Sequence, residues 1–230
     1  MTQVADSPED TPPREIIRAV PFLPSKCGDC VATARMSFEE FLDLDHTGLA
    51  EWVDGEVHLY MSVTMAHQRV VDFLNRLLGF VVNLTDSGEV ITAPYAMAAV
   101  RGGPGREPDI TFIAANHESL VTRSHLMGAP DLVVEVVSVD SVRRDRRVKR
   151  AEYEAAGIRE YWIVDSREGH LGDTQFLILV DGVYVEVAPV DGVYRSLAVP
   201  GFWLRTEWLA QERPNALAAF REIEASFGNV

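Results

Sequence analysis

Apolar residues recur every three or four positions in several parts of the chain, which is the spacing of one face of an α-helix. This pattern predicts helices over residues 65–83 and 216–227, each with an apolar face that can cover a β-sheet. A capping-box sequence predicts a shorter helix over 37–44. Residues 141–156 are strongly charged and are followed by Gly157, a residue type that often ends helices in the left-handed conformation, so a further helix is expected there.

Other apolar runs are too short for helices and are bounded by turn-forming residues, which predicts β-strands. The segment 132–137 (LVVEVV) is almost continuously apolar, as in strands that are buried on both faces. The segments 176–180 and 183–187 flank Asp181-Gly182, a strong signal for a β-hairpin. Further strands are expected near 56–61, 89–92, 95–100, 110–114 and 161–165. We therefore predict an α+β fold, with one mixed central sheet flanked by helices and an antiparallel β-meander added late in the chain.

The beginning of the chain differs from the rest. The first 34 residues contain five prolines and little apolar periodicity, so we expect residues 1–34 to form a flexible leader and residues 35–230 to form a single domain. Cys27 and Cys30 form a Cys-x-x-Cys pair in this leader, but a tetrahedral zinc site needs two further ligands and a redox pair normally opens a helix. Ordinary thiols are the favoured interpretation, and an intermolecular zinc or disulfide contact is the alternative.

Composition and charge narrow the class of protein. With 47% hydrophobic and 24% charged residues, the chain is typical of a globular protein. Its formal net charge of −14 repels nucleic acid at long range, so a polyanion must be bound by a local basic patch. No segment has the roughly 18 consecutive apolar residues of a membrane span, and the N-terminus lacks the features of a signal peptide, so we expect a cytoplasmic protein without membrane contact.

Glu135 stands inside the apolar strand at 132–137, where an ionised carboxylate needs a cationic partner such as a metal ion or a buried base. Asp109 and Asp131, each preceded by proline, are the candidates for a second carboxylate. Asp131 belongs to the same strand, and at ~3.3 Å per residue its backbone lies roughly 13 Å from Glu135, too far to share an ion. If the strands at 110–114 and 132–137 pair antiparallel, Asp109 lies beside Glu135, and this pair can ligate one Mg²⁺.

Lys149 is one of only two lysines among 21 cations, so its compact ammonium invites a specific role. The functional interpretation is that Lys149 reaches from its helix toward the carboxylates and stabilises charge that develops on a phosphate. The alternative is a surface ion pair with Asp145, four residues earlier. Residues 141–150 carry six cations and one anion, a net +5 that suits a phosphate, although a solvated helix face is the alternative.

These residues resemble a known family. Their order and spacing are similar to those of the Uma-two family of restriction endonucleases, part of the PD-(D/E)XK nuclease superfamily, over about residues 37–189. In the superfamily pattern a lysine stands two residues after the glutamate, whereas this chain has Val137 there. In the Uma-two family this lysine is displaced to the following helix, and Lys149 matches the displaced position. The matching residues are Glu51 to Glu56, the helix with His67, Pro108-Asp109, Gly128 to Ser138, Asp145, Lys149, Tyr153, Gly157 and Glu160 to Asp165.

The resemblance implies a restriction-endonuclease-like core with a site that hydrolyses DNA phosphodiester bonds and depends on Mg²⁺ or Mn²⁺. It implies Asp109 and Glu135 as metal ligands and catalytic residues, with Lys149 as a third catalytic residue. His67 and Glu51 are candidates for auxiliary residues of this site. The alternative for His67 is a hydrogen-bonded, partly buried histidine without a catalytic role, and the alternative for Glu51 is a charge at the start of a strand. A homodimer is expected, because cutting two strands needs two sites.

Two other functions stay open on the sequence alone. A catalytically inactive nuclease fold that binds nucleic acid or protein is favoured by the acidity of the chain, because a general DNA-cutting enzyme is usually basic. Hydrolysis of a small phosphodiester is the third interpretation. It would show as activity on a model diester without activity on plasmid DNA.

Overall fold

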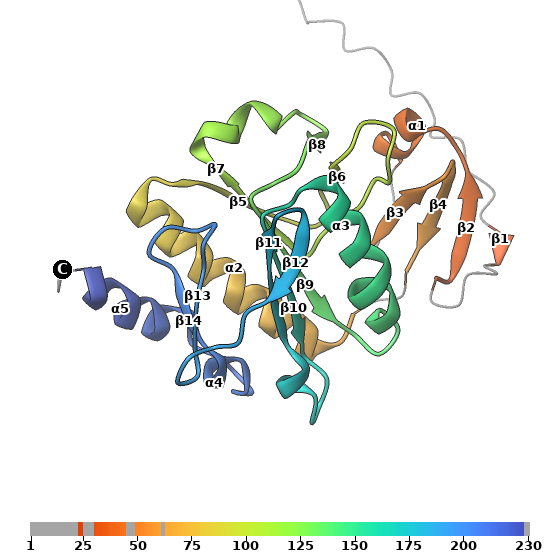
Figure 1. Ribbon diagram of the computed structural model, residues 1–230. Coiled ribbons are helices and arrows are strands. Elements are labelled where there is room, and N and C mark those ends of the chain that lie inside the picture. The colour runs from red at the N-terminus through yellow and green to blue at the C-terminus, as the bar shows by residue number, and fades with distance from the viewer. Residues whose placement is uncertain (1–22, 25–29, 45–48, 61–62, 228–230) are drawn as a thin grey trace, which may run out of the picture.

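A six-stranded mixed sheet lies at the centre of the computed structural model, which describes residues 23–24, 30–44, 49–60 and 63–227 (Figure 1). Its strand order is β12-β11-β10-β9-β7-β5. β9 and β10 are parallel, and the other neighbouring pairs of this sheet are antiparallel. The strands are β5 (Gly88–Thr92), β7 (Ile110–Ala114), β9 (Leu132–Val137), β10 (Glu160–Asp165), β11 (Gln175–Val180) and β12 (Val183–Glu186).

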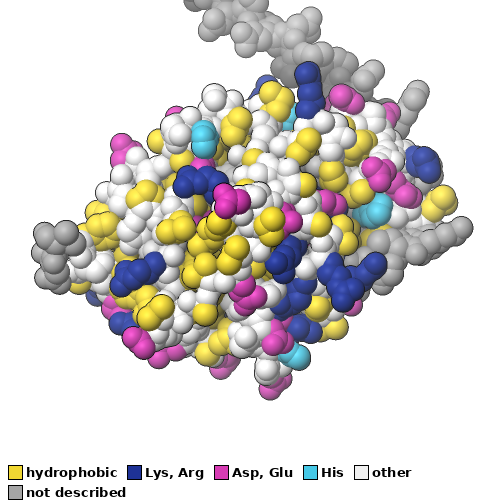
Figure 2. All heavy atoms as spheres, in the orientation of Figure 1, with side chains coloured by type: hydrophobic (Ala, Val, Ile, Leu, Met, Phe, Trp, Pro, Cys, Tyr) yellow, Lys and Arg dark blue, Asp and Glu magenta, His cyan; other side chains and the backbone are white. Residues whose placement is uncertain are grey.

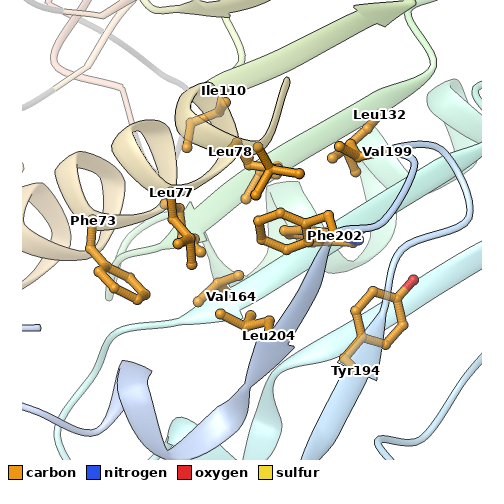
Figure 3. Packing of buried hydrophobic residues seen from close by; sticks show 14 of the residues in the cluster. Phe73, Leu77, Leu78, Ile110, Leu132, Val164, Tyr194, Val199, Phe202 and Leu204 are labelled. Carbon is orange, nitrogen blue, oxygen red and sulfur yellow. The ribbon is translucent and has the colours of Figure 1, made fainter. Parts of the chain in front are cut away.

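Helices cover both faces of this sheet. The face that carries Val134 packs against α2 (Met65–Thr85), and α5 (Ala216–Phe227) lies beside α2 in the same apolar core. Figure 3 shows this core, with leucine and phenylalanine side chains of α2 directed toward the strands. The opposite face, which carries Val133, packs against α3 (Arg150–Ala156). All six residues of β9 are buried, as the continuous apolar sequence predicts.

Shorter elements surround the central sheet. A four-stranded sheet with the order β1-β2-β4-β3 lies beside α1, and two-stranded sheets are formed by β6 with β8 and by β13 with β14. These elements are β1 (Leu23–Pro24), β2 (Ala32–Arg35), α1 (Phe38–Leu42), β3 (Ala50–Val53), β4 (Glu56–Leu59), β6 (Ala96–Ala98), the 3₁₀ turn η1 (Ala115–Leu120), β8 (His125–Met127), the π-helical turn η2 (Arg144–Lys149), the 3₁₀ turn η3 (Leu171–Asp173), β13 (Val193–Arg195), β14 (Trp203–Arg205) and α4 (Thr206–Leu209).

Several local predictions are confirmed in detail. Ser37 caps α1, and its side chain and that of Glu40 form the reciprocal bonds of a capping box. Gly157 ends α3 in the left-handed conformation, with φ of 79°. Asp181 and Gly182 join β11 to β12 with φ values of 50° and 81°, the positive angles that a two-residue hairpin turn requires.

Other features differ from the prediction because they depend on partners that are distant in sequence. Residue 34, where the expected leader ends, lies inside β2, which pairs with β4, but most of the expected leader lies outside the described residues, so the division into leader and domain stays a prediction. β3 was not predicted, because its four residues are too few to show a periodic pattern. β6 pairs with β8 instead of joining the central sheet. The charged segment 141–156 enters its helix through a π-helical turn rather than as one regular helix.

Glu160 is a fully buried carboxylate at the start of β10 that organises part of the core. Its Oε1 accepts hydrogen bonds from the Trp162 indole and the Tyr194 hydroxyl, each at 2.6 Å. Its Oε2 accepts three more from the loop 196–198, two from backbone amides and one from a hydroxyl. One side chain therefore satisfies five buried or half-buried donors, one on its own strand and four in residues 194–198.

We expect Glu160→Ala to lower the free energy of unfolding by about 4 kcal/mol, because five donors lose a charged acceptor inside the protein. Urea denaturation measures this change. The matched control is Glu222→Ala, which removes an exposed carboxylate paired with Arg205 and should change stability by less than about 0.5 kcal/mol. A loss below about 1 kcal/mol for Glu160→Ala would show that this network does not hold the core together.

Candidate active site

The strand pairing brings two acidic residues to one place. β7 and β9 are antiparallel, with Ile110 opposite Val134, and the same register continued by one residue puts Asp109 opposite Glu135. Oδ2 of Asp109 accepts a hydrogen bond of 2.7 Å from the backbone amide of Val136, which fixes the aspartate against β9. The antiparallel pairing assumed for these strands is therefore confirmed.

Lys149 reaches this pair from the end of η2. Its Nζ lies 2.7 Å from Oε1 of Glu135 and 2.7 Å from Oε1 of Glu51, and 3.8 Å from Oδ1 of Asp145. The hydroxyl of Tyr153 donates a hydrogen bond of 2.8 Å to the same Oε1 of Glu135. Lys149 is 1% exposed, so the alternative of a surface ion pair with Asp145 is wrong.

The π-helical turn sets the direction from which Lys149 approaches. Asp145 is the second residue of this turn, and its backbone amide donates to the Ser141 carbonyl, while the Tyr161 hydroxyl donates to the Asp145 carbonyl. Nearby, the Arg144 guanidinium lies over the Tyr60 ring, 3.9 Å from its centre. π-helical turns are rare and often occur at functional sites. The widened turn thus holds buried polar groups close to the end of β9.

Glu51 links the small N-terminal sheet to this cluster. It is fully buried on β3, and its Oε2 accepts a bond of 2.7 Å from Arg106. Arg106 also donates two hydrogen bonds to the two oxygens of Glu152, at 2.9 and 2.6 Å. Burial disfavours the charge of Glu51, but Lys149, Arg106 and Arg144 outweigh burial and lower the pKa of Glu51 to about 2. Glu51 is therefore an ionised partner of Lys149.

His67 contacts the other carboxylate. It lies in the first turn of α2, where the side chain of Thr64 accepts a bond from the His67 backbone amide. Its Nε2 is 3.2 Å from Oδ2 of Asp109, and the residue is 3% exposed. His67 is thus a buried histidine whose Nε2 lies beside a candidate metal ligand, and both interpretations stay open.

The comparisons with known proteins identify the family and the fold of the chain. Residues 38–207 match the model of the Uma2 family, which is described as "Putative restriction endonuclease". The chain belongs to the Uma2 family. No curated protein matches the chain.

Among solved structures, this Uma2 chain is similar to one described as a "putative nuclease belonging to DUF820" from Anabaena variabilis, with a TM-score of 0.59. The two share 15% sequence identity, and the match covers 76% of this chain and 97% of the other. At that identity the likeness shows a common fold. The predicted α+β, restriction-endonuclease-like architecture is confirmed, and nuclease activity is the activity that membership of Uma2 indicates.

All five residues singled out from the sequence meet in this Uma2 site. Glu135 contacts Lys149, Lys149 contacts Glu51, and Asp109 contacts His67 and lies opposite Glu135. Their catalytic, metal-binding and auxiliary roles stay predictions.

Asp131 takes no part in the cluster, because it lies at the other end of the same buried segment. Its Oδ2 accepts a bond from the Ala114 amide and lies 2.9 Å from Nδ1 of His117. This position agrees with its interpretation as a residue at the start of a strand.

The charge and the oxygen donors of this site suit a divalent cation. The groups around Glu135 include five carboxylates and three cations, so their formal charge is −2 when all five carboxylates are ionised and His67 is neutral. Burial raises the pKa of Glu135 to about 8, and the charges of neighbouring carboxylates add to this effect against the opposing charge of Lys149. The carboxylates belong to Glu51, Asp109, Glu135, Asp145 and Glu152, and the cations to Arg106, Arg144 and Lys149.

The number of available ligands indicates which kind of metal site fits. Within the described ranges, no three His, Cys, Asp or Glu side chains are arranged to hold a metal by themselves. Mg²⁺ is commonly bound through one or two carboxylates, and water and substrate phosphates supply its other ligands. Asp109 and Glu135 therefore fit Mg²⁺ or Mn²⁺ held together with a substrate, and they do not fit a closed structural site.

Tyr153 and Arg106 were not assigned to the site from the sequence, although Tyr153 is among the residues that match the family. Tyr153 follows Lys149 by four residues, one helical turn, so its place on the same helix face was a usable signal. Arg106 lies after a glycine-rich loop, and no periodic pattern connects it with Glu51 or Glu152. Its role depends on the conformation of that loop.

Two further expectations are only partly covered by the described residues. Cys30 is buried, whereas Cys27 lies outside those residues, so the Cys-x-x-Cys interpretation stays a prediction. Within the described part of the chain, none of the helices combines the length and the apolar character needed to cross a membrane.

Proposed function

We propose that this Uma2 protein is a metal-dependent endonuclease that hydrolyses DNA phosphodiester bonds at Asp109, Glu135 and Lys149. The observation that carries the proposal is the buried ammonium of Lys149, which lies 2.7 Å from a carboxylate that faces a second carboxylate across the β7–β9 pair. Asp109 and Glu135 would hold Mg²⁺ or Mn²⁺, in keeping with the negative charge and the oxygen donors of the cluster.

When bound, the cation would lower the pKa of a water ligand and neutralise phosphate charge. Lys149 would stabilise the negative charge that develops on the phosphate during attack. Glu51 supplies a second carboxylate that contacts the ammonium of Lys149 and so fixes the position of the ammonium. The contacts of Asp109 among the described residues use Oδ2, so His67 and the backbone amide orient the aspartate while Oδ1 stays available to a metal.

A basic surface next to the site is suited to the DNA backbone. Figure 2 shows dark blue Lys and Arg side chains gathered near α3. Arg143 and Arg147 are exposed there, while Arg146 is held by Asp165 and Gln175. In a chain with a net charge of −14, this patch is the place where phosphate groups are attracted most strongly, because exposed guanidinium groups bind phosphate without a large cost in desolvation.

We expect the double variant Arg143→Ala/Arg147→Ala to bind DNA about tenfold more weakly at physiological salt. The slope of the logarithm of the binding constant against the logarithm of the salt concentration should become shallower by about two. Fluorescence anisotropy of a labelled duplex without divalent cation measures both values. The control is Arg221→Ala, which removes an exposed arginine on α5. Equal effects of both changes would show that binding here is only a response to overall charge.

The proposal includes a homodimer, since two sites are needed to cut both strands of a duplex. Sedimentation equilibrium of the full chain, with and without DNA, tests it.

A second candidate function is favoured by the acidity of the chain: an inactive nuclease fold that binds nucleic acid or protein. The two candidates differ in metal binding that depends on Asp109.

Cleavage of supercoiled plasmid with Mg²⁺ or Mn²⁺ tests the activity directly. The proposal expects nicked or linear product that disappears when the cation is chelated. Metal-independent cleavage, or the absence of cleavage together with Asp109-independent metal binding, would contradict it. Activity on a model diester without activity on plasmid would instead identify a small phosphodiester as the substrate.

A further inference from the structure

Tyr153 is a buried polar group at this site to which the proposed mechanism assigns no role. It lies on α3, is 1% exposed, and donates a hydrogen bond of 2.8 Å to Oε1 of Glu135. The ammonium of Lys149 lies 2.7 Å from the same oxygen. Two donors therefore converge on one of the two oxygens of the Glu135 carboxylate.

The position of the Tyr153 hydroxyl is fixed by packing. Its ring meets the Tyr161 ring edge-on, with centres 5.1 Å apart and planes at 87°. Tyr161 is itself held by a hydrogen bond of 3.0 Å to the Asp145 carbonyl. Both rings are almost completely buried, so their packing holds the hydroxyl of Tyr153 against Glu135.

The occupied oxygen limits what Glu135 offers to a cation. Each carboxylate oxygen has two lone pairs, and on Oε1 both are engaged by Lys149 and Tyr153. Among the described residues, the contacts of Glu135 use Oε1, which leaves Oε2 for a metal. Ca²⁺ often binds both oxygens of a carboxylate, whereas Mg²⁺ demands a compact octahedral arrangement in which each ligand supplies one oxygen.

We propose that Tyr153 is a positioning residue that, together with Lys149, keeps Oε1 of Glu135 occupied, so that Glu135 presents a single oxygen and the site favours Mg²⁺ over Ca²⁺. This inference rests on the proposed function, because it requires a divalent cation at Asp109 and Glu135.

Isothermal calorimetry of the full chain with Mg²⁺ alone and with Ca²⁺ alone tests the proposal without any measurement of activity. We expect Tyr153→Phe to weaken Mg²⁺ binding about tenfold, as for other groups that orient a metal ligand. Ca²⁺ binding should weaken less, because Oε1 then becomes available to it. The ratio of the two dissociation constants therefore shifts toward Ca²⁺.

Tyr184→Phe is the matched control. Its hydroxyl is also buried and donates to the Ile158 carbonyl at 2.9 Å, and its ring also packs against Tyr161. The variant loses a comparable hydrogen bond away from the carboxylates, so both dissociation constants should stay within about twofold of the wild type.

The possible results separate this inference from the proposed function. Wild-type affinities and an unchanged ratio in Tyr153→Phe would overturn the inference alone, as would equal losses in Tyr153→Phe and Tyr184→Phe. A wild-type chain that binds neither cation, or Asp109→Ala that binds as tightly as the wild type, would overturn the proposed function and this inference with it.

Infrared spectroscopy of the wild-type chain gives a second test that does not depend on the folding of the Tyr153 variant. Labelling glutamate with ¹³C at the side-chain carboxyl separates its bands from those of aspartate. When Mg²⁺ binds, coordination through one oxygen widens the separation between the antisymmetric and symmetric stretches, and coordination through both oxygens narrows it. We expect a widened separation that is absent from Glu135→Gln, and a narrowed one would overturn the inference.

Discussion

Replacement of Lys149 by methionine is expected to lower the rate of plasmid cleavage about a thousandfold. Burial opposes the charge on Lys149, but the carboxylates of Glu135 and Glu51 outweigh it and raise the pKa of the lysine. The ammonium therefore stays charged at neutral pH. Methionine keeps a similar length and the apolar part of the side chain and removes the ammonium, with its charge and its hydrogen bond to Glu135, so the rate of cleavage at saturating Mg²⁺ measures what the ammonium contributes.

Loss of folding must be separated from loss of chemistry in this experiment. Lys149→Met leaves the buried carboxylate of Glu135 without its cation and removes one of the cations that contact Glu51, which costs about 3–5 kcal/mol of stability. The double variant Glu51→Gln/Lys149→Met removes one charge of each sign and should recover part of that stability without recovering cleavage. Arg150→Met, which removes the next cation along the helix, is the control for charge alone. A folded Lys149→Met protein that retains more than about a tenth of the wild-type rate would contradict the assigned role.

Glu135→Gln is expected to weaken Mn²⁺ binding at least about a hundredfold and to abolish cleavage. The amide has nearly the same shape as the carboxylate and still accepts hydrogen bonds from Lys149 and Tyr153, but it lacks the charge that attracts the cation. Calorimetry with Mn²⁺ and the plasmid assay measure the two effects.

Asp131→Asn provides a matched control for this change. Asp131 is also buried, and it stands next to the opposite end of β9. This control should bind Mn²⁺ and cleave plasmid as the wild type does. Comparable losses in both variants would show that the site responds to any change near β9.

The pair Asp109 and Glu135 could be predicted from the sequence because each step uses a local rule. An apolar run of six residues identifies a strand buried on both faces, and the charge inside it demands a partner. Strand spacing then excludes Asp131, and antiparallel pairing selects Asp109. The scarcity of lysine drew attention to Lys149, although sequence alone left a surface ion pair open.

The rest of the site depends on contacts between segments that no local pattern connects. Glu51 reaches Lys149 only because the small N-terminal sheet packs against the core, and Arg106 reaches Glu51 from a loop without regular structure. The π-helical turn depends on bonds to Ser141 and from Tyr161. Periodicity predicts each helix or strand separately, so it does not predict how one element packs against another.

The most direct test of the account is a crystal structure of the full chain with Mn²⁺, in which anomalous scattering locates the metal. The account predicts one strong peak within about 2.2 Å of an oxygen of Asp109 and an oxygen of Glu135, with the ammonium of Lys149 nearby. A peak elsewhere, or no peak at Mn²⁺ concentrations that saturate binding in solution, would contradict the claim that these two carboxylates share one cation.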